Sequence, residues 1–142
     1  MILLDTCVLY HWSAGTIPDV AMSAIERAEI RFLHAISAWE MACKHRDGKY
    51  PMSPDPETWM RTAIESLHLT VLVGDLSDGI NAALLPLHHR DPADRLMIAL
   101  AKRHNWPAVT SDAVWQQYGV QTVWDWPLAA RNPRRRPGRS AP

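Results

Sequence analysis

The feature that most limits the fold is the alternation of short apolar runs with longer amphipathic segments along the chain. The patterns predict strands at 2–4, 31–36, 69–74, 107–110 and 120–124, and helices at 6–15, 18–30, 37–48, 56–67, 76–85, 92–104 and 112–119. Strands that alternate with helices form a parallel sheet, because each crossover helix covers one of its faces. The sequence therefore predicts an α/β fold with a central parallel β-sheet flanked by helices.

Charge divides the chain into an acidic body and a basic end. The 142 residues, 47% hydrophobic and 21% charged, are typical of one globular domain. Residues 131–142 hold five arginines and no acid, whereas residues 1–130 hold ten basic and fifteen acidic residues, a net charge of about −5. We expect a single domain over 1–130 and a basic, disordered tail over 131–142 that could contact a polyanion.

Several classes of protein are disfavoured. No apolar run approaches the length of a membrane helix, and Asp5 interrupts the apolar N-terminus, unlike a secretory signal. Cys7 and Cys43 lie far apart without a CxxC pattern, which argues against a disulfide framework and against a zinc site. Reduced cysteines fit a cytoplasmic protein, and we expect no membrane partner.

Three carboxylates fall where such a sheet places chemistry, just outside the carboxyl ends of its strands. Asp5 ends the first predicted strand, Asp112 follows the fourth, and Glu40 lies one turn into the helix after the second. Each also has a structural alternative. Asp5 and Asp112 could cap the helices that follow them, and Ser37 with Glu40 matches the spacing of a capping box.

Asp94 is harder to explain as a structural residue. In the helix predicted over 92–104, it flanks an apolar stripe that should face the core, formed by Ala93, Leu96, Met97, Leu100 and Ala101. Asp91, directly before Pro92, already supplies the helix cap. Asp94 is therefore expected to be half-buried and to need a cation, since an unpaired buried carboxylate is costly.

Acids gathered in one cleft would repel each other by about 4 kcal/mol per close pair at an effective dielectric constant near 20. Few basic neighbours are expected to help, because Arg95 should point to solvent and pair on the surface, and His88 and His89 should be exposed loop residues. A divalent cation removes the conflict, and oxygen ligands favour Mg²⁺, with Mn²⁺ as a possible substitute. Such a site suits hydrolysis of phosphodiester bonds by an activated water.

Four segments resemble PIN-domain proteins in order and spacing, and look most like the VapC-type toxins of toxin–antitoxin pairs: LLDTCVLYHW, SAWEMACKHRDGKYPMSPDPETW, LHHRDPADRLMIALA and VTSD. The resemblance covers nearly all of residues 1–125. It implies a PIN fold, Mg²⁺-dependent endoribonuclease activity on RNA, a cognate antitoxin and a homodimer.

The resemblance also assigns roles to residues. It implies four catalytic and metal-binding acids, Asp5, Glu40, Asp94 and Asp112. It further implies three accessory residues, Asp91 and the hydroxyl residues Thr110 and Ser111. The chain departs from many relatives at Cys7, where they have Asn or His. Cysteine is a poor magnesium ligand, so Cys7 should be structural.

Two other functions stay open at this point. A phosphatase of the aspartate-nucleophile type would use Asp5 to attack phosphorus, but that chemistry usually wants a second acid two residues later, where Cys7 stands. A non-catalytic PIN-fold module would bind an antitoxin or RNA without cutting it. Loss of one or more acids would indicate such a module, and all four are present. The RNA target does not follow from the sequence.

Overall fold

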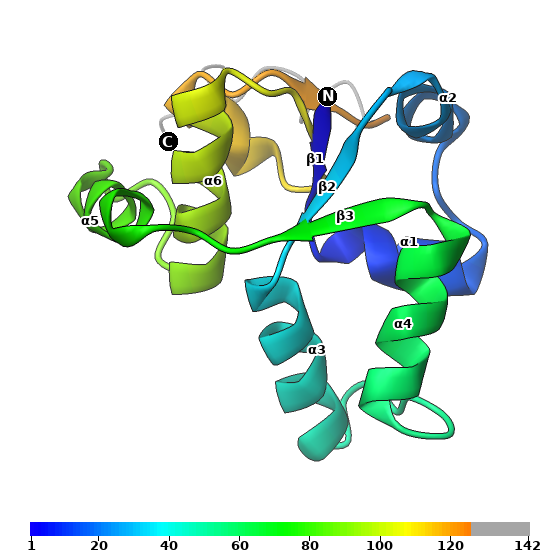
Figure 1. Cartoon of the computed structure of the whole chain (residues 1–142). Coiled ribbons are helices and arrows are strands. Elements are labelled where there is room, and N and C mark those ends of the chain that lie inside the picture. The colour runs from blue at the N-terminus through cyan, green and yellow to red at the C-terminus, as the bar shows by residue number, and fades with distance from the viewer. Residues whose placement is uncertain (126–142) are drawn as a thin grey trace, which may run out of the picture.

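The computed structural model describes residues 1–125 and confirms a parallel α/β fold. Five strands form one sheet in the order β3-β2-β1-β4-β5, and every pairing is parallel (Figure 1). The strands are β1 (Ile2–Leu4), β2 (Arg31–His34), β3 (Leu69–Leu72), β4 (Ala108–Val109) and β5 (Thr122–Val123). The last four are shorter than predicted. The predicted tail over 131–142 and the last five residues of the predicted domain lie outside the described residues.

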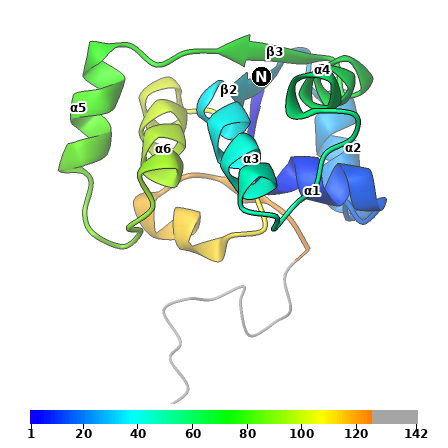
Figure 2. The ribbon, with the colours of Figure 1, turned by 90° about the horizontal axis from the view of Figure 1, so that it is seen from below.

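Helices connect the strands in the predicted order. They are α1 (Cys7–Ala14), α2 (Asp19–Arg27), α3 (Ile36–Arg46), α4 (Pro56–Ser66), α5 (Leu76–Leu84) and α6 (Pro92–His104), followed by the 3₁₀ helix η1 (Ala113–Tyr118). Figure 2 shows α5 and α6 on one side of the molecule and α1, α2 and α4 on the other, with α3 between α4 and α6. Within residues 1–125, none of the helices has the length and apolar character needed to span a membrane.

The core lies on both faces of the sheet, because neighbouring side chains of a strand point to opposite faces. Leu3 of β1 packs in a cluster with Met97 of α6 and Trp115 of η1. Leu4, next along the strand, packs in the opposite cluster with Val8 and Leu9 of α1. Every residue of β1 is buried, as expected for a central parallel strand, and this explains its continuous apolar sequence.

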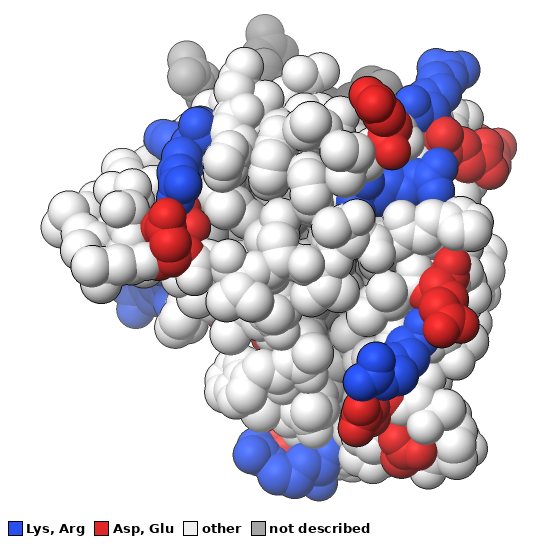
Figure 3. Space-filling model, viewed as in Figure 1, with Lys and Arg blue, Asp and Glu red and all other residues white. Residues whose placement is uncertain are grey.

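The carboxyl ends of β1 and β4 lie side by side at one edge of the sheet. The backbone amide of Asp5, just after β1, donates to the carbonyl of Val109, the last residue of β4, at 2.9 Å. Away from this edge, the face seen in Figure 3 has its charged side chains at the margins, while its middle is uncharged. Residues that follow β1 and β4, such as Asp5 and Asp112, therefore lie at the same edge of the sheet.

The helix caps test the structural alternatives for the acids. Asp91 caps α6 by accepting from the amide of Ala93, and Asp112 caps η1 by accepting from the amide of Val114, both at 2.9 Å, as predicted. Asp5 makes no side-chain cap to α1.

The predicted capping box of Ser37 and Glu40 is wrong. Ala35 is the N-cap of α3 and has helical backbone angles (φ −58°, ψ −22°), and no side chain caps this helix. Because α3 begins at Ile36 rather than after Ser37, the Ser37 side chain lies inside the first turn and is fully buried. Glu40 is thus free of a capping role.

Candidate active site

The four predicted acids come together at the carboxyl edge of the sheet. Carboxylate oxygens of Glu40, Asp91 and Asp94 lie within 4.8 Å of one another, and so do ligand atoms of His89, Asp94 and Asp112. Asp94 belongs to both groups and lies between them. Asp5 lies close enough to Asp94 and Glu40 for their charges to raise its pKa. Segments more than 100 residues apart in sequence thus supply one acidic cluster.

Asp5 is the most buried of the acids, with 6% of its surface exposed. Its Oδ2 accepts a hydrogen bond of 2.6 Å from the hydroxyl of Thr110. Burial, followed by the negative charge of Asp94, raises the pKa of Asp5 to about 7, although the Thr110 hydrogen bond lowers it. A carboxyl group with this pKa is only partly ionised at neutral pH, and a bound cation would favour its charged form.

The Glu40 carboxylate is held by the hydroxyl of Thr6, which lies two residues after the end of β1. The Thr6 hydroxyl donates to Glu40 Oε2 at 2.5 Å, and it also lies 2.8 Å from the Ser37 hydroxyl. Burial raises the pKa of Glu40, and the Thr6 hydrogen bond opposes this rise. Thr6 was not among the predicted site residues, although its position directly after Asp5 at a strand end was a usable signal.

Asp94 lies beside the buried stripe of α6, as predicted, with 15% of its side chain exposed. Its Oδ1 accepts a hydrogen bond of 3.1 Å from the indole nitrogen of the fully buried Trp115. Burial raises the pKa of Asp94, and a positive charge on His89 would lower it. The expectation of a half-buried carboxylate without a capping role is therefore confirmed.

One hydroxyl connects the two strand ends. Thr110 donates to Asp5 and accepts a 3.0 Å hydrogen bond from the backbone amide of Asp112. The backbone amide of Ser111 donates to the sulfur of Cys7 at 3.3 Å. Burial raises the pKa of the Cys7 thiol to about 12, so the thiol is protonated at neutral pH in the metal-free protein. This agrees with a structural role for Cys7.

Two predictions about basic residues are wrong. Arg95 does not point to solvent: it is 6% exposed, and its guanidinium donates to backbone carbonyls rather than to surface acids. His89 is not an exposed loop residue, since its Nε2 lies 2.8 Å from Asp112 Oδ2 and its side chain is 17% exposed. His88 is exposed, as expected. Both errors arise because the partners are brought in by tertiary folding.

The donor set fits a hard divalent cation. Glu40, Asp91 and Asp94 offer only carboxylate oxygens, the ligands that Mg²⁺ and Mn²⁺ prefer. Burial, and to a smaller extent the charges of neighbouring acids, raise the pKa of Asp5, Glu40 and Asp94, so a cation bound here would favour their ionised forms. Arg95, the buried cation of α6, is bound by carbonyls and does not compensate them. These residues can therefore hold a metal ion.

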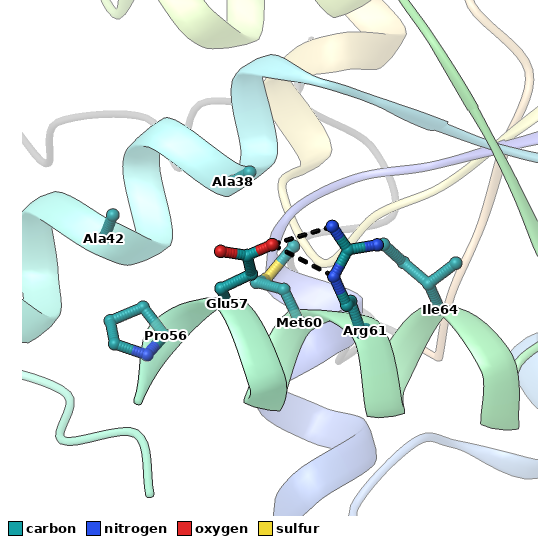
Figure 4. Close-up of a pocket in the computed structure, with 7 residues that line it drawn as sticks. All are labelled: Ala38, Ala42, Pro56, Glu57, Met60, Arg61 and Ile64. Atoms are coloured by element: carbon teal, nitrogen blue, oxygen red, sulfur yellow. Dashed lines mark hydrogen bonds and ion pairs between the residues drawn. The ribbon is translucent and has the colours of Figure 1, made fainter. Parts of the chain in front are cut away.

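An apolar pocket lies between α3 and α4, away from this chemistry (Figure 4). Ala38 and Ala42 of α3 line one wall, and α4 supplies the other wall, where Glu57 and Arg61 form an ion pair of 2.7 Å. None of the predicted acids lines this pocket, so it adds no reactive group to the site.

The class of protein that the fold and the site define is an α/β protein with a cluster of carboxylates at the carboxyl edge of a parallel sheet. Comparison with known proteins identifies the family. The sequence pattern of the PIN domain matches residues 2–121, and the chain therefore belongs to the PIN domain family. The chain is 33% identical to Ribonuclease VapC22 of Mycobacterium tuberculosis over 114 residues, which cover 78% of this chain and 86% of that protein.

Solved structures share the fold at low sequence identity. VapBC2 from Rickettsia felis, bound to a DNA fragment from its promoter, aligns with a TM-score of 0.67 and 14% identity over 88% of this chain and 100% of that chain. VapBC-1 from nontypeable Haemophilus influenzae aligns with a TM-score of 0.61 and 15% identity over 86% of this chain and 96% of that chain. The PIN fold expected from the sequence is thus confirmed.

Proposed function

We propose that the chain is a Mg²⁺-dependent endoribonuclease that acts as the toxin of a toxin–antitoxin pair, with Mn²⁺ as a substitute ion. The main support is the convergence of Asp5, Glu40, Asp94 and Asp112 at one edge of the sheet, where burial raises the pKa of Asp5 to about 7. The identity of 33% to a VapC ribonuclease supports RNA as the substrate.

Each residue has a proposed task. The four acids hold the ion, and the accessory residues Asp91, Thr110 and Ser111 shape the site around them. Thr110 fixes Asp5 and the backbone of Asp112 with a single hydroxyl, which keeps the two strand ends in register. An ion held by these acids would supply Lewis-acid chemistry, which lowers the pKa of a bound water and offsets the charge that develops on phosphorus. Since water rather than the RNA 2′-hydroxyl attacks, we expect products with a 5′-phosphate and a 3′-hydroxyl.

The proposal includes partners. A toxin–antitoxin complex from Klebsiella pneumoniae shares this fold, which supports a cognate antitoxin as a partner of the chain. We also propose that the chain forms a homodimer. Cys7 and Cys43 are both free thiols, which supports a reducing cytoplasm as its location. We retain a domain over 1–130 and a basic tail over 131–142 as predictions.

The decisive experiment compares the wild-type protein with Asp94→Asn on total RNA, in Mg²⁺ and in EDTA. We expect cleavage only by the wild type in Mg²⁺. Asp55→Asn is the matched control, since Asp55 is an exposed helix cap that belongs to neither group of site residues, and asparagine caps equally well. Cleavage in EDTA, or full activity of Asp94→Asn, would contradict the proposal.

The same preparation separates the two alternatives. A binding module would retain RNA or antitoxin without cutting it in either buffer. A phosphatase would release inorganic phosphate from phosphate monoesters, with Asp5 forming a covalent intermediate, and would leave internal phosphodiester bonds intact. A substrate with a single 2′-deoxy nucleotide at the cleavage position should still be cut, because the 2′-hydroxyl takes no part.

A further inference from the structure

His89 is a polar residue of the acid site to which the proposed function gives no task. Its Nε2 lies 2.8 Å from Asp112 Oδ2 and 3.6 Å from Asp94 Oδ2. Because its side chain is 17% exposed, it is enclosed with these carboxylates rather than free in solvent. The distances alone allow two roles, a metal ligand or a hydrogen-bond donor.

The other ring nitrogen distinguishes these roles. His89 Nδ1 accepts a hydrogen bond of 3.1 Å from the backbone amide of Asp91. A neutral imidazole has one protonated and one unprotonated nitrogen, so an accepting Nδ1 requires the proton to be on Nε2. A protonated Nε2 has no lone pair for a metal ion. His89 therefore donates to Asp112 and is not a ligand while this bond persists.

The backbone of His89 is fixed from two sides. Its amide donates to the Tyr118 hydroxyl at 2.7 Å, and that hydroxyl donates to the carbonyl of Pro86 at 2.7 Å. The carbonyl of His89 accepts from Arg95 at 2.9 Å. Arg95 also donates to the carbonyls of Pro86, Ala83 and Leu85. The segment before α6 is thus clamped, and the imidazole is presented to the acids in a set orientation.

We propose that His89 is a positioning residue of this site, whose Nε2–H holds the Asp112 carboxylate facing Asp94. The Val114 amide holds the other oxygen of Asp112 at 2.9 Å, so both carboxylate oxygens are fixed by donors. Each oxygen keeps a further lone pair that a cation can use. The inference rests on the proposed function only in so far as a divalent ion is what Asp112 is positioned to bind.

Two amide variants each keep one of the two hydrogen bonds that the His89 ring makes. In His89→Gln, the terminal NH₂ reaches the place of Nε2 and can still donate to Asp112. In His89→Asn, the shorter side chain can accept from the Asp91 amide in the place of Nδ1, but it does not reach Asp112. A merely structural role predicts that both variants lose stability similarly, whereas positioning predicts that only His89→Gln retains function.

The first measurement is Mn²⁺ binding by titration calorimetry, without RNA. Residues that orient a metal ligand typically contribute ten- to a hundredfold in affinity, so we expect His89→Asn to bind Mn²⁺ about tenfold more weakly than the wild type. His89→Gln should stay within about threefold of the wild type on the same scale. Equal Mn²⁺ affinity for wild type and His89→Asn, or equal losses in both variants, would overturn the proposal.

The second measurement is the ring-nitrogen NMR spectrum of His89 at pH 8, in the metal-free and the Mg²⁺-loaded protein. We expect the proton on Nε2 in both states. A proton on Nδ1, on both nitrogens, or lost from Nε2 when Mg²⁺ is added would overturn the assignment. This spectrum decides the role of His89 even if the wild type binds no Mn²⁺, a result that contradicts the proposed function instead.

Discussion

The two halves of the acid site are built in different ways. In the buried half, Asp5 and Glu40 are held by hydroxyls from residues next to the strand ends, Thr110 and Thr6. In the outer half, the Asp112 side chain is 34% exposed, and it is held by an imidazole from the segment before α6. The buried half is positioned by residues next to the strand ends. The outer half depends on His89, whose backbone is held by Tyr118 and Arg95.

The halves also differ in their electrostatics. Asp5 is buried with only a hydroxyl and a thiol as hydrogen-bond partners, and its pKa rises to about 7. Burial raises the pKa of Asp94 as well, but the hydrogen bond from the Trp115 indole opposes this rise. The negative charge of a carboxylate is therefore least stable in the buried half, at Asp5, and a bound cation would stabilise it most there.

The largest expected effect comes from neutralising the buried half. Asp5→Asn keeps the shape of the side chain and removes its charge. Loss of several kcal/mol of metal-assisted charge stabilisation corresponds to about a 10³-fold drop in RNA cleavage rate. Initial rates in saturating Mg²⁺ test this. A rate within tenfold of the wild type would mean that the buried half is dispensable.

Removing the Arg95 side chain, whose hydrogen bonds hold the segment before α6, should affect the outer half. Arg95→Met leaves four backbone carbonyls without their charged donor, and removing a buried charged partner costs about 3 kcal/mol. For a chain of this size we expect the melting temperature to fall by roughly 9 °C. Arg61→Met, which breaks the exposed pair with Glu57, is the control and should not change it measurably. Similar losses in both variants would contradict the clamp.

The buried half also predicts how the stability of the metal-free protein depends on pH. The pKa of Asp5 is raised from 3.8 to about 7, so between these values the folded protein holds a proton that the unfolded chain has released. The stability that Asp5 contributes is therefore fully present below pH 3.8 and is lost as the pH rises through about 7, with a fall of about 2 kcal/mol, or roughly 6 °C, between pH 5 and 7.

Thermal melts in EDTA at several pH values test this dependence. The melting temperature of the Asp5→Asn protein should fall much less, because asparagine has no proton to release at this position. Addition of Mg²⁺ at pH 8 should raise the melting temperature of the wild type and not that of Asp5→Asn. A wild-type melting temperature that increases from pH 5 to 7 would contradict the buried position of Asp5.

The smallest expected effect concerns the Thr110 hydroxyl, which forms hydrogen bonds with Asp5 in the buried half and with the backbone amide of Asp112 in the outer half. Thr110→Val keeps the volume of the side chain but removes the donor to Asp5 and the acceptor for the Asp112 amide. We expect about tenfold slower cleavage, since residues that orient metal ligands contribute tenfold or more. Thr110→Ser, which keeps the hydroxyl, should stay close to the wild type. Equal rates for Val and Ser would show that Thr110 acts only through packing.

Much of the fold and of the site follows from local sequence. The order of strands and helices, the caps supplied by Asp91 and Asp112, and the half-buried position of Asp94 were all predicted correctly. These features depend on periodicity and on hydrogen bonds between residues two to four positions apart. The convergence of the acids was also predictable, because parallel strands end at one edge.

The sequence by itself thus determined the fold and where the acids lie, whereas only the tertiary structure decided how they are held. Arg95 was assigned to the surface because burying a charge is costly, but the fold gives it four carbonyls between 2.7 and 3.2 Å away. Thr6 meets Ser37 across 31 residues and Glu40 across 34, and His89 meets Asp112 across 23. No local pattern encodes such pairs, since their distances exist only once the sheet has formed.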